Sequence, residues 1–88
     1  MTEQAVRALV AEALDYANVS AMRERHRTQL FLEGRADIPI RDLEMDSLAV
    51  MELCIAIEAN TGVEIVPEDL QRLRTLDRLV HEVLSGLR

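Results

Sequence analysis

The segment from Ser47 to about Asn60 constrains the fold more than any other part of the chain. Read as a helix at about 100° per residue, it carries apolar side chains over roughly 200° of its circumference. A helix of this kind has to be surrounded by other elements, so the sequence predicts a helical bundle with this segment at its centre. The residues on the apolar arc are Val50, Met51, Leu53, Cys54, Ile55 and Ile57, and those on the open side are Ala49, Glu52, Ala56, Ala59 and Asn60.

Three more segments have helical character. Residues 2–17 and 76–87 repeat apolar side chains at helical spacing, and each run follows a threonine, Thr2 or Thr75, that can cap a helix. Thr61-Gly62 ends the central helix, and Pro67 suits the first turn of a short helix. The sequence therefore predicts an all-α fold: a small antiparallel four-helix bundle of three main helices and one short one, forming a single domain over residues 1–88.

Residues 18–45 form a long connection for which two interpretations stay open. In one, Ser20 caps a weaker helix from Ala21 to about Leu32, with Gly34 just past its end. Its inner face would then hold Met22, His26 and Leu30. In the other, the connection is an irregular loop pinned by Leu30, Leu32, Ile38 and Ile40. Because Pro39 excludes a regular helix, we expect Ile38 and Ile40 to enter the core from an extended segment in both cases.

The charge of the chain is unevenly distributed. The net charge is −6, yet residues 42–70 contain eight acidic residues and no basic residue, and all ten arginines lie elsewhere. An acidic stretch of this kind argues against nucleic acid and for a partner with a basic surface, with a solvated helix face as the alternative. The basic cluster at residues 23–27 is interpreted as a solvated face, or else as a group that docks a partner or pairs with the acidic helix.

Other sequence features limit the class of protein. The chain has no apolar run long enough to cross a membrane and no signal-peptide pattern. A single cysteine, Cys54, cannot form an internal disulfide, and its place on the apolar arc favours a core residue over a nucleophile. We therefore expect a soluble cytoplasmic protein without membrane insertion.

Ser47 is the most prominent polar residue of the sequence. Asp46 is a good N-terminal cap, so Ser47 is expected in the first helical turn, with an exposed hydroxyl where an attached phosphate is favoured. One cysteine and two histidines make no zinc site, and neither a histidine base nor a Gly-x-Ser-x-Gly elbow accompanies the serine. We interpret Ser47 as an acceptor modified by another enzyme, and the chain as neither an enzyme nor a metal-binding protein.

Residues 42–84 resemble an acyl carrier protein. The resemblance implies that Ser47 is the attachment point of 4′-phosphopantetheine, transferred from coenzyme A by a phosphopantetheinyl transferase, and that Asp46 assists this transfer. The arm would carry acyl intermediates as thioesters to partner enzymes with basic docking surfaces, and Leu48, Met51, Glu52 and Glu58 are the predicted partner-recognition residues. The matching residues are Asp42-Leu43-Glu44-Met45-Asp46-Ser47-Leu48, Glu52-Leu53, Ile57-Glu58, Gly62-Val63-Glu64-Ile65, Glu68-Asp69-Leu70, Thr75-Leu76 and Leu79.

The chain also departs from the family's pattern. Glu44 stands where a glycine is usual, and Ala49 and Ala59 stand where fatty-acid carriers have acids. This thinner acidic face favours a dedicated polyketide, lipid-modifying or other specialised acyl pathway over general fatty acid synthesis, and Asp46 favours an acyl over a peptidyl carrier. We expect a monomer. Two alternatives stay open: an unmodified carrier-like helical adaptor that binds a basic partner through the acidic second helix, and a small dimerising bundle.

Overall fold

The computed structural model describes residues 1–87. Within that range every regular element is helical, which confirms the predicted all-α class, and an isolated β-bridge joins Pro39 to Thr75. The elements in chain order are α1 (Glu3–Tyr16), η1 (Ser20–Arg23), α2 (Arg25–Leu32), η2 (Ile40–Leu43), α3 (Ser47–Thr61), α4 (Pro67–Leu73) and α5 (Leu76–Gly86), where η marks a 3-10 helix.

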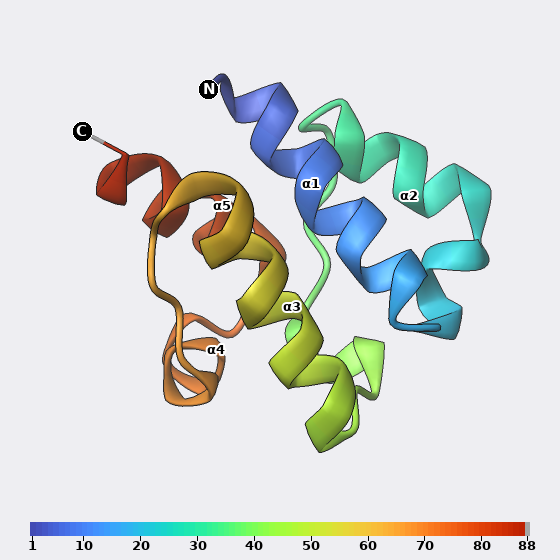
Figure 1. Cartoon of the computed structure of the whole chain (residues 1–88). Coiled ribbons are helices and arrows are strands. Elements are labelled where there is room, and N and C mark those ends of the chain that lie inside the picture. Colours follow the sequence, from blue (N-terminus) through green and yellow to red (C-terminus); the bar gives the residue numbers. More distant parts are fainter. Residues whose placement is uncertain (88) are drawn as a thin grey trace.

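The core lies where α1 packs against both α3 and α5 (Figure 1). It is aliphatic except for Phe31, which α2 contributes and which is fully buried. The predicted stripes of α1 and α5 supply most of it, whereas Leu87 at the end of α5 is partly exposed. The fully buried side chains of the three helices are Val6, Val10 and Leu14 in α1, Leu53 and Ile57 in α3, and Leu76, Leu79, Val80 and Val83 in α5.

The predicted starts of α1, α4 and α5 and the predicted end of α3 are confirmed. The hydroxyls of Thr2 and Thr75 accept hydrogen bonds from backbone N–H groups in the first turns of α1 and α5. Pro67 is the first residue of α4, where its missing N–H costs nothing. Gly62 ends α3 with φ of 76°, a left-handed conformation that suits glycine.

The connection between α1 and α3 contains the helix α2, as in the first of the two interpretations of residues 18–45, so the described residues form one α-helix more than the predicted four. The predicted cap was wrong: Ser20 begins η1, and Glu24 caps α2 by accepting hydrogen bonds from the N–H groups of His26 and Arg27, at 3.1 and 2.7 Å. Packing turns Phe31 of α2 inward and leaves His26 exposed and Leu30 half-buried, so the predicted inner face of this helix was wrong. Gly34 follows the helix with φ of 73°, as expected.

The rest of this connection is fastened to the junction of α4 and α5. The N–H of Ile40 donates to the carbonyl oxygen of Arg74 at 2.8 Å, and the N–H of Leu76 donates to the carbonyl oxygen of Ile38 at 3.0 Å. Ile38 is buried in the core, which confirms its predicted entry from an extended segment. For Ile40 the prediction was wrong, because this residue is only half-buried and begins η2, a 3-10 helix that can follow Pro39.

The predicted position of α3 was wrong. Met51 and Ile55 belong to the predicted buried arc, yet they are 53% and 61% exposed, while Ala49 from the predicted open side is buried. The helix therefore lies at the surface of the bundle along one side rather than at its centre. Because α3 is apolar nearly all round, its hydrophobicity has no direction that could fix which side faces inward.

A buried arginine ties three helices together. Arg7 of α1 is 3% exposed, and its guanidinium donates to the Asp77 carboxylate at 2.8 Å, to the Glu3 carboxylate at 3.0 Å and to the Phe31 carbonyl oxygen at 3.1 Å. It also lies 5.0 Å from the centre of the Phe31 ring. Burial lowers the pKa of Arg7, but the hydrogen bonds to Asp77 and Glu3 outweigh burial and the net direction is upward. The guanidinium thus stays charged inside the fold.

Candidate functional site

Ser47 is the first residue of α3, and its side chain is exposed. Asp46 precedes it as the N-cap, and one carboxylate oxygen of Asp46 accepts a hydrogen bond from the N–H of Ala49 at 2.8 Å. The helix start that the sequence predicted is therefore present. In Figure 1, α3 begins at the lower end of the molecule, beside the chain of η2. The remaining free N–H groups and the helix dipole favour negative charge at this point.

A groove of about 1020 Å³ opens beside Ser47. It lies between the first turns of α3, the helix α4 and the segment that runs from Pro39 to Asp46. The sequence did not predict this groove, since its walls come from three parts of the chain that only the fold brings together. Apolar side chains in its lining are Pro39, Ile40, Met45, Val50, Met51, Pro67 and Leu70, and charged ones are Arg41, Glu44, Asp46 and Arg74.

Glu44 makes the turn from η2 into this site. Its backbone is left-handed, with φ of 50° and ψ of 43°, and its side chain is exposed. This is the position at which the sequence carries glutamate in place of the usual glycine. A side chain in this conformation costs about 1–2 kcal/mol. The chain therefore accepts backbone strain immediately before the helix that presents Ser47.

The predicted partner-recognition residues lie on α3 with unequal exposure. Leu48, Met51 and Glu58 are exposed, whereas Glu52 is half-buried. Leu48 is 65% exposed and, together with Met51 and Ile55, it forms an apolar row along the helix that we call the α3 stripe. Ile55 was not predicted as a surface residue. Because Ile55 follows Met51 by four residues, it lies on the same side of the helix, and this spacing was the one sign of its exposure in the sequence. The sign was easy to miss, since α3 is apolar on nearly every side.

The acidic side chains of α3 remain free of ion pairs within residues 1–87. Neither Glu52 nor Glu58 makes an ion pair or a side-chain hydrogen bond there. The basic cluster does pair with the acidic stretch, but before α3: Arg27 lies 3.1 Å from the Asp42 carboxylate in η2. The acidic charge of α3 is therefore available to an outside partner.

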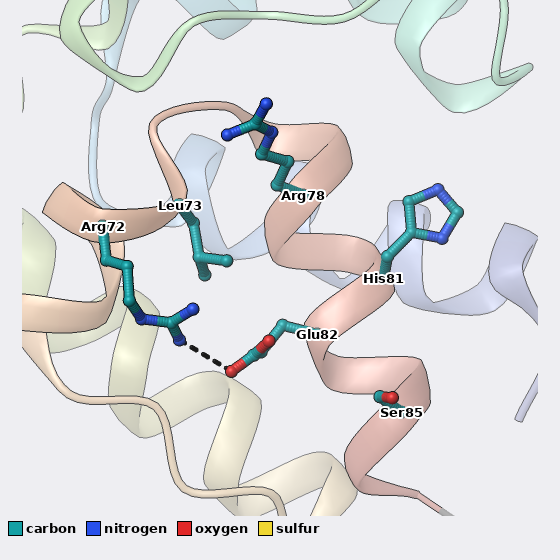
Figure 2. Close-up of a pocket in the computed structure, with 6 residues that line it drawn as sticks. All are labelled: Arg72, Leu73, Arg78, His81, Glu82 and Ser85. Atoms are coloured by element: carbon teal, nitrogen blue, oxygen red, sulfur yellow. Dashed lines mark hydrogen bonds and ion pairs between the residues drawn. The ribbon is translucent and has the colours of Figure 1, made fainter.

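A smaller depression of about 410 Å³ lies between α4 and α5 and shares no lining residue with the groove beside Ser47 (Figure 2). Arg72 reaches across it to the Glu82 carboxylate at 2.8 Å, while His81 points away from this pair.

Cys54 is buried, as predicted. Burial, and after it the charges of Asp69 and Glu68, raise the pKa of the Cys54 thiol. Residues 1–87 contain no group of three or more His, Cys, Asp or Glu side chains placed to hold a metal ion.

The sequence was compared with protein families, with curated proteins and with solved structures. Residues 27–83, more than half of the chain, match the family described as the phosphopantetheine attachment site. The chain belongs to this family. Comparisons with curated proteins and with solved structures gave no significant match.

Membership fixes the general role of the molecule. The domain is a carrier that bears a covalently attached 4′-phosphopantetheine group, which confirms the resemblance to acyl carrier proteins. Carrier domains of this family work with a phosphopantetheinyl transferase and with enzymes that handle acyl groups. In the part of this carrier domain that the structure describes, no helix has both the length and the hydrophobicity to cross a membrane.

The geometry fits such a group. An exposed hydroxyl at the start of a fifteen-residue helix places an attached phosphate where backbone N–H groups and the helix dipole stabilise it. The adjoining groove gives the rest of a flexible arm a partly apolar surface to lie on.

Proposed function

We propose that Ser47 is the attachment residue and that the domain is an acyl carrier protein. Ser47 is the single serine within residues 27–83, since Ser20 and Ser85 both lie outside the matched range. Its hydroxyl is exposed at the first position of α3 and borders the groove, and this placement is the observation that carries the proposal. The arm supplies a thiol on which acyl groups are held as thioesters.

The residues around Ser47 have separate roles in this proposal. Asp46 holds the helix start through one carboxylate oxygen, and its other oxygen makes no hydrogen bond within residues 1–87, so it is free to assist the transferase. Neither His26 nor His81 lines the groove beside Ser47, so in this proposal the activation of its hydroxyl comes from the transferase. The carrier presents its cargo and leaves the chemistry to its partners.

Partner enzymes would bind α3. Its exposed apolar stripe and the unpaired carboxylates of Glu52 and Glu58 fit a surface with an apolar centre and basic surroundings. Ala59 is exposed where a general fatty-acid carrier has an acid, whereas Ala49 is buried and takes no part in this face. Leu48, Met51 and Ile55 make the face more apolar than acidic. These features support a dedicated acyl, polyketide or lipid pathway. We further propose that the protein works in the cytoplasm as a monomer.

The attachment site is tested by intact mass after incubation with coenzyme A and a broad-specificity phosphopantetheinyl transferase. We expect a mass gain of one phosphopantetheine in the unaltered protein, and no gain in Ser47→Ala. Ser20→Ala and Ser85→Ala are matched controls, because both serines are exposed and both variants should keep the gain. Circular dichroism checks that each variant is folded.

Two results would contradict the proposal in different ways. A gain that persists in Ser47→Ala would mean that another residue carries the arm. If the unaltered protein gains no mass while it remains folded, the alternative of an unmodified helical adaptor that binds partners through α3 would be favoured.

A further inference from the structure

Two arginines from distant parts of the chain meet at the groove beside Ser47. Arg41 lies in η2 and Arg74 lies at the junction of α4 and α5, and both line the groove. The hydrogen bond from the N–H of Ile40 to the carbonyl oxygen of Arg74, 2.8 Å long, holds the two backbones together. The fold therefore brings two arginines from separate parts of the sequence to the groove that Ser47 also lines.

Arg74 occupies this place in a strained conformation. Its φ of 70° and ψ of −29° lie in the left-handed region, at a helix end where glycine is the usual residue. Its backbone is fixed there by two hydrogen bonds, since its N–H donates to the carbonyl oxygen of Leu70 as well. A side chain that persists in strained backbone is a reason to look for a function.

Neither arginine has a strong partner within residues 1–87. Arg74 makes no ion pair there, and Arg41 approaches a single carboxylate, that of Asp42, at 3.9 Å while its side chain is 90% exposed. Other arginines of the fold do find carboxylates at short distance, such as Arg72 with Glu82 at 2.8 Å. Because neither arginine has a close counter-charge, the positive charge of each is available to an anion held in the groove.

We propose that Arg41 and Arg74 form an anion subsite that binds a carboxylate on the cargo of the arm. The inference rests on the proposed attachment at Ser47, and it narrows the cargo to acyl groups that end in a carboxylate. A guanidinium matches a carboxylate with two parallel hydrogen bonds, and the apolar lining between the walls accommodates the methylene chain.

The arm's own phosphate is the other anion that could reach this groove. It would be bonded directly to Ser47 at the start of α3, where free backbone N–H groups and the helix dipole already stabilise a phosphate. Arg41 and Arg74 belong to other elements, η2 and the junction of α4 and α5. Because the phosphate has stabilising groups of its own, the two arginines are left for an anion farther along the arm, and the experiment separates the two anions.

The test compares two cargoes of equal length on the same protein. Coenzyme A thioesters of glutaric and pentanoic acid are loaded with the transferase, and intact mass confirms each product. The side-chain Nε–H signals of the arginines are then recorded by NMR in the glutaryl, pentanoyl and cargo-free holo forms. We expect the glutaryl form alone to shift the Arg41 and Arg74 signals, with a shift that shrinks as salt is added.

Variants connect the shift to these two residues. In the unaltered protein we also expect the glutaryl form to melt at a higher temperature than the pentanoyl form, because the bound carboxylate adds charge-assisted hydrogen bonds to the folded state. This difference should shrink in Arg41→Gln and in Arg74→Gln, and it should vanish in the double variant. Arg78→Gln is the matched control, because Arg78 is exposed and does not line the groove. If Arg74→Gln proves unstable, Arg74→Gly removes the same charge and relieves the left-handed backbone.

The outcomes are distinguishable. Equal shifts for both cargoes, or an equal loss in Arg78→Gln, would overturn the proposal. A full shift already in the cargo-free holo form would also overturn it, and would assign the arginines to the phosphate of the arm. A failure to load either cargo, visible in the mass, would count against Ser47 attachment itself.

Discussion

Arg7 shows how a single polar residue can organise an apolar fold. It joins α1 to the carbonyl end of α2 and to the first turn of α5, with Glu3, Phe31 and Asp77 as partners. Asp37 extends the connection, because its carboxylate accepts hydrogen bonds from the N–H groups of both Ile38 and Asp77. The segment that leads to the groove is thereby tied to the core.

The Arg7 network is tested by removing its cation. In Arg7→Ala we expect the free energy of unfolding to fall by about 3 kcal/mol, the lower end of the range for broken buried pairs, because Glu3 and Asp77 are partly exposed. Urea denaturation measures the loss. Arg78→Ala, at an exposed position, should change the free energy by less than about 0.5 kcal/mol. Equal stability of the two variants would show that the network contributes little.

Glu44 provides a second test at the level of one residue. Glu44→Gly should raise the free energy of unfolding by about 1 kcal/mol, since glycine adopts the left-handed backbone without strain. Thermal unfolding measures the change. The matched control is Glu64→Gly, an exposed acid outside the set of residues with positive φ, where glycine should not stabilise. A loss of stability in Glu44→Gly would mean that the glutamate side chain is held by interactions that outweigh the strain.

At the scale of elements, α3 divides its apolar residues between core and surface. Leu53 and Ile57 are fully buried, whereas Met51 and Ile55 face outward on the stripe. One helix thus supports the fold on one side and, on the other, exposes the face on which we propose that partners dock.

This division predicts opposite effects of neighbouring substitutions. Ile55→Gln should change the free energy of unfolding by less than about 0.5 kcal/mol, yet lower kcat/KM for modification by a transferase that docks on α3. Ile57→Ala should cost about 2–5 kcal/mol. Urea denaturation and transferase kinetics check the two effects. If Ile55→Gln destabilised the fold as strongly as Ile57→Ala, the stripe would be a packed surface and the docking interpretation would fail.

The elements also show how far the sequence determines the fold. Helices with a local marker at their ends, such as Thr2, Gly62 and Pro67, were predicted correctly, because caps and left-handed ends are local chemistry. The side of α3 that faces the core and the first residue of α2 were not predicted correctly, since tertiary packing decides both. At the site, the exposed Ser47 and its Asp46 cap followed from the sequence, whereas the groove and its arginines depend on backbones that only the fold brings together.

At the scale of the whole molecule, charge is separated along the chain. The acids of residues 42–70 find few partners, since Arg27 and Arg72 each pair with one residue of this stretch at close distance. The carboxylates of α3 are left to repel one another and to attract basic partners.

Moderate salt or millimolar divalent cation should therefore raise the melting temperature of the protein, because counter-ions screen this repulsion. Thermal unfolding at increasing salt checks the effect. A Glu52→Gln, Glu58→Gln double variant removes two of the unpaired charges and should respond less. A flat response of the unaltered protein would mean that the surrounding arginines already neutralise the acidic stretch.

The bond between Ile40 and Arg74 has a mechanical consequence for the groove. Together with the hydrogen bond from the N–H of Leu76 to the carbonyl oxygen of Ile38, it joins residues 38–41 and 74–76 into one hydrogen-bonded unit. No hydrogen bond within residues 1–87 joins this unit to the first turn of α3. The groove is therefore bordered by a hydrogen-bonded unit on one side and by the start of α3 on the other, and a bulky cargo held in it would lie next to the helix on which we propose that partners dock.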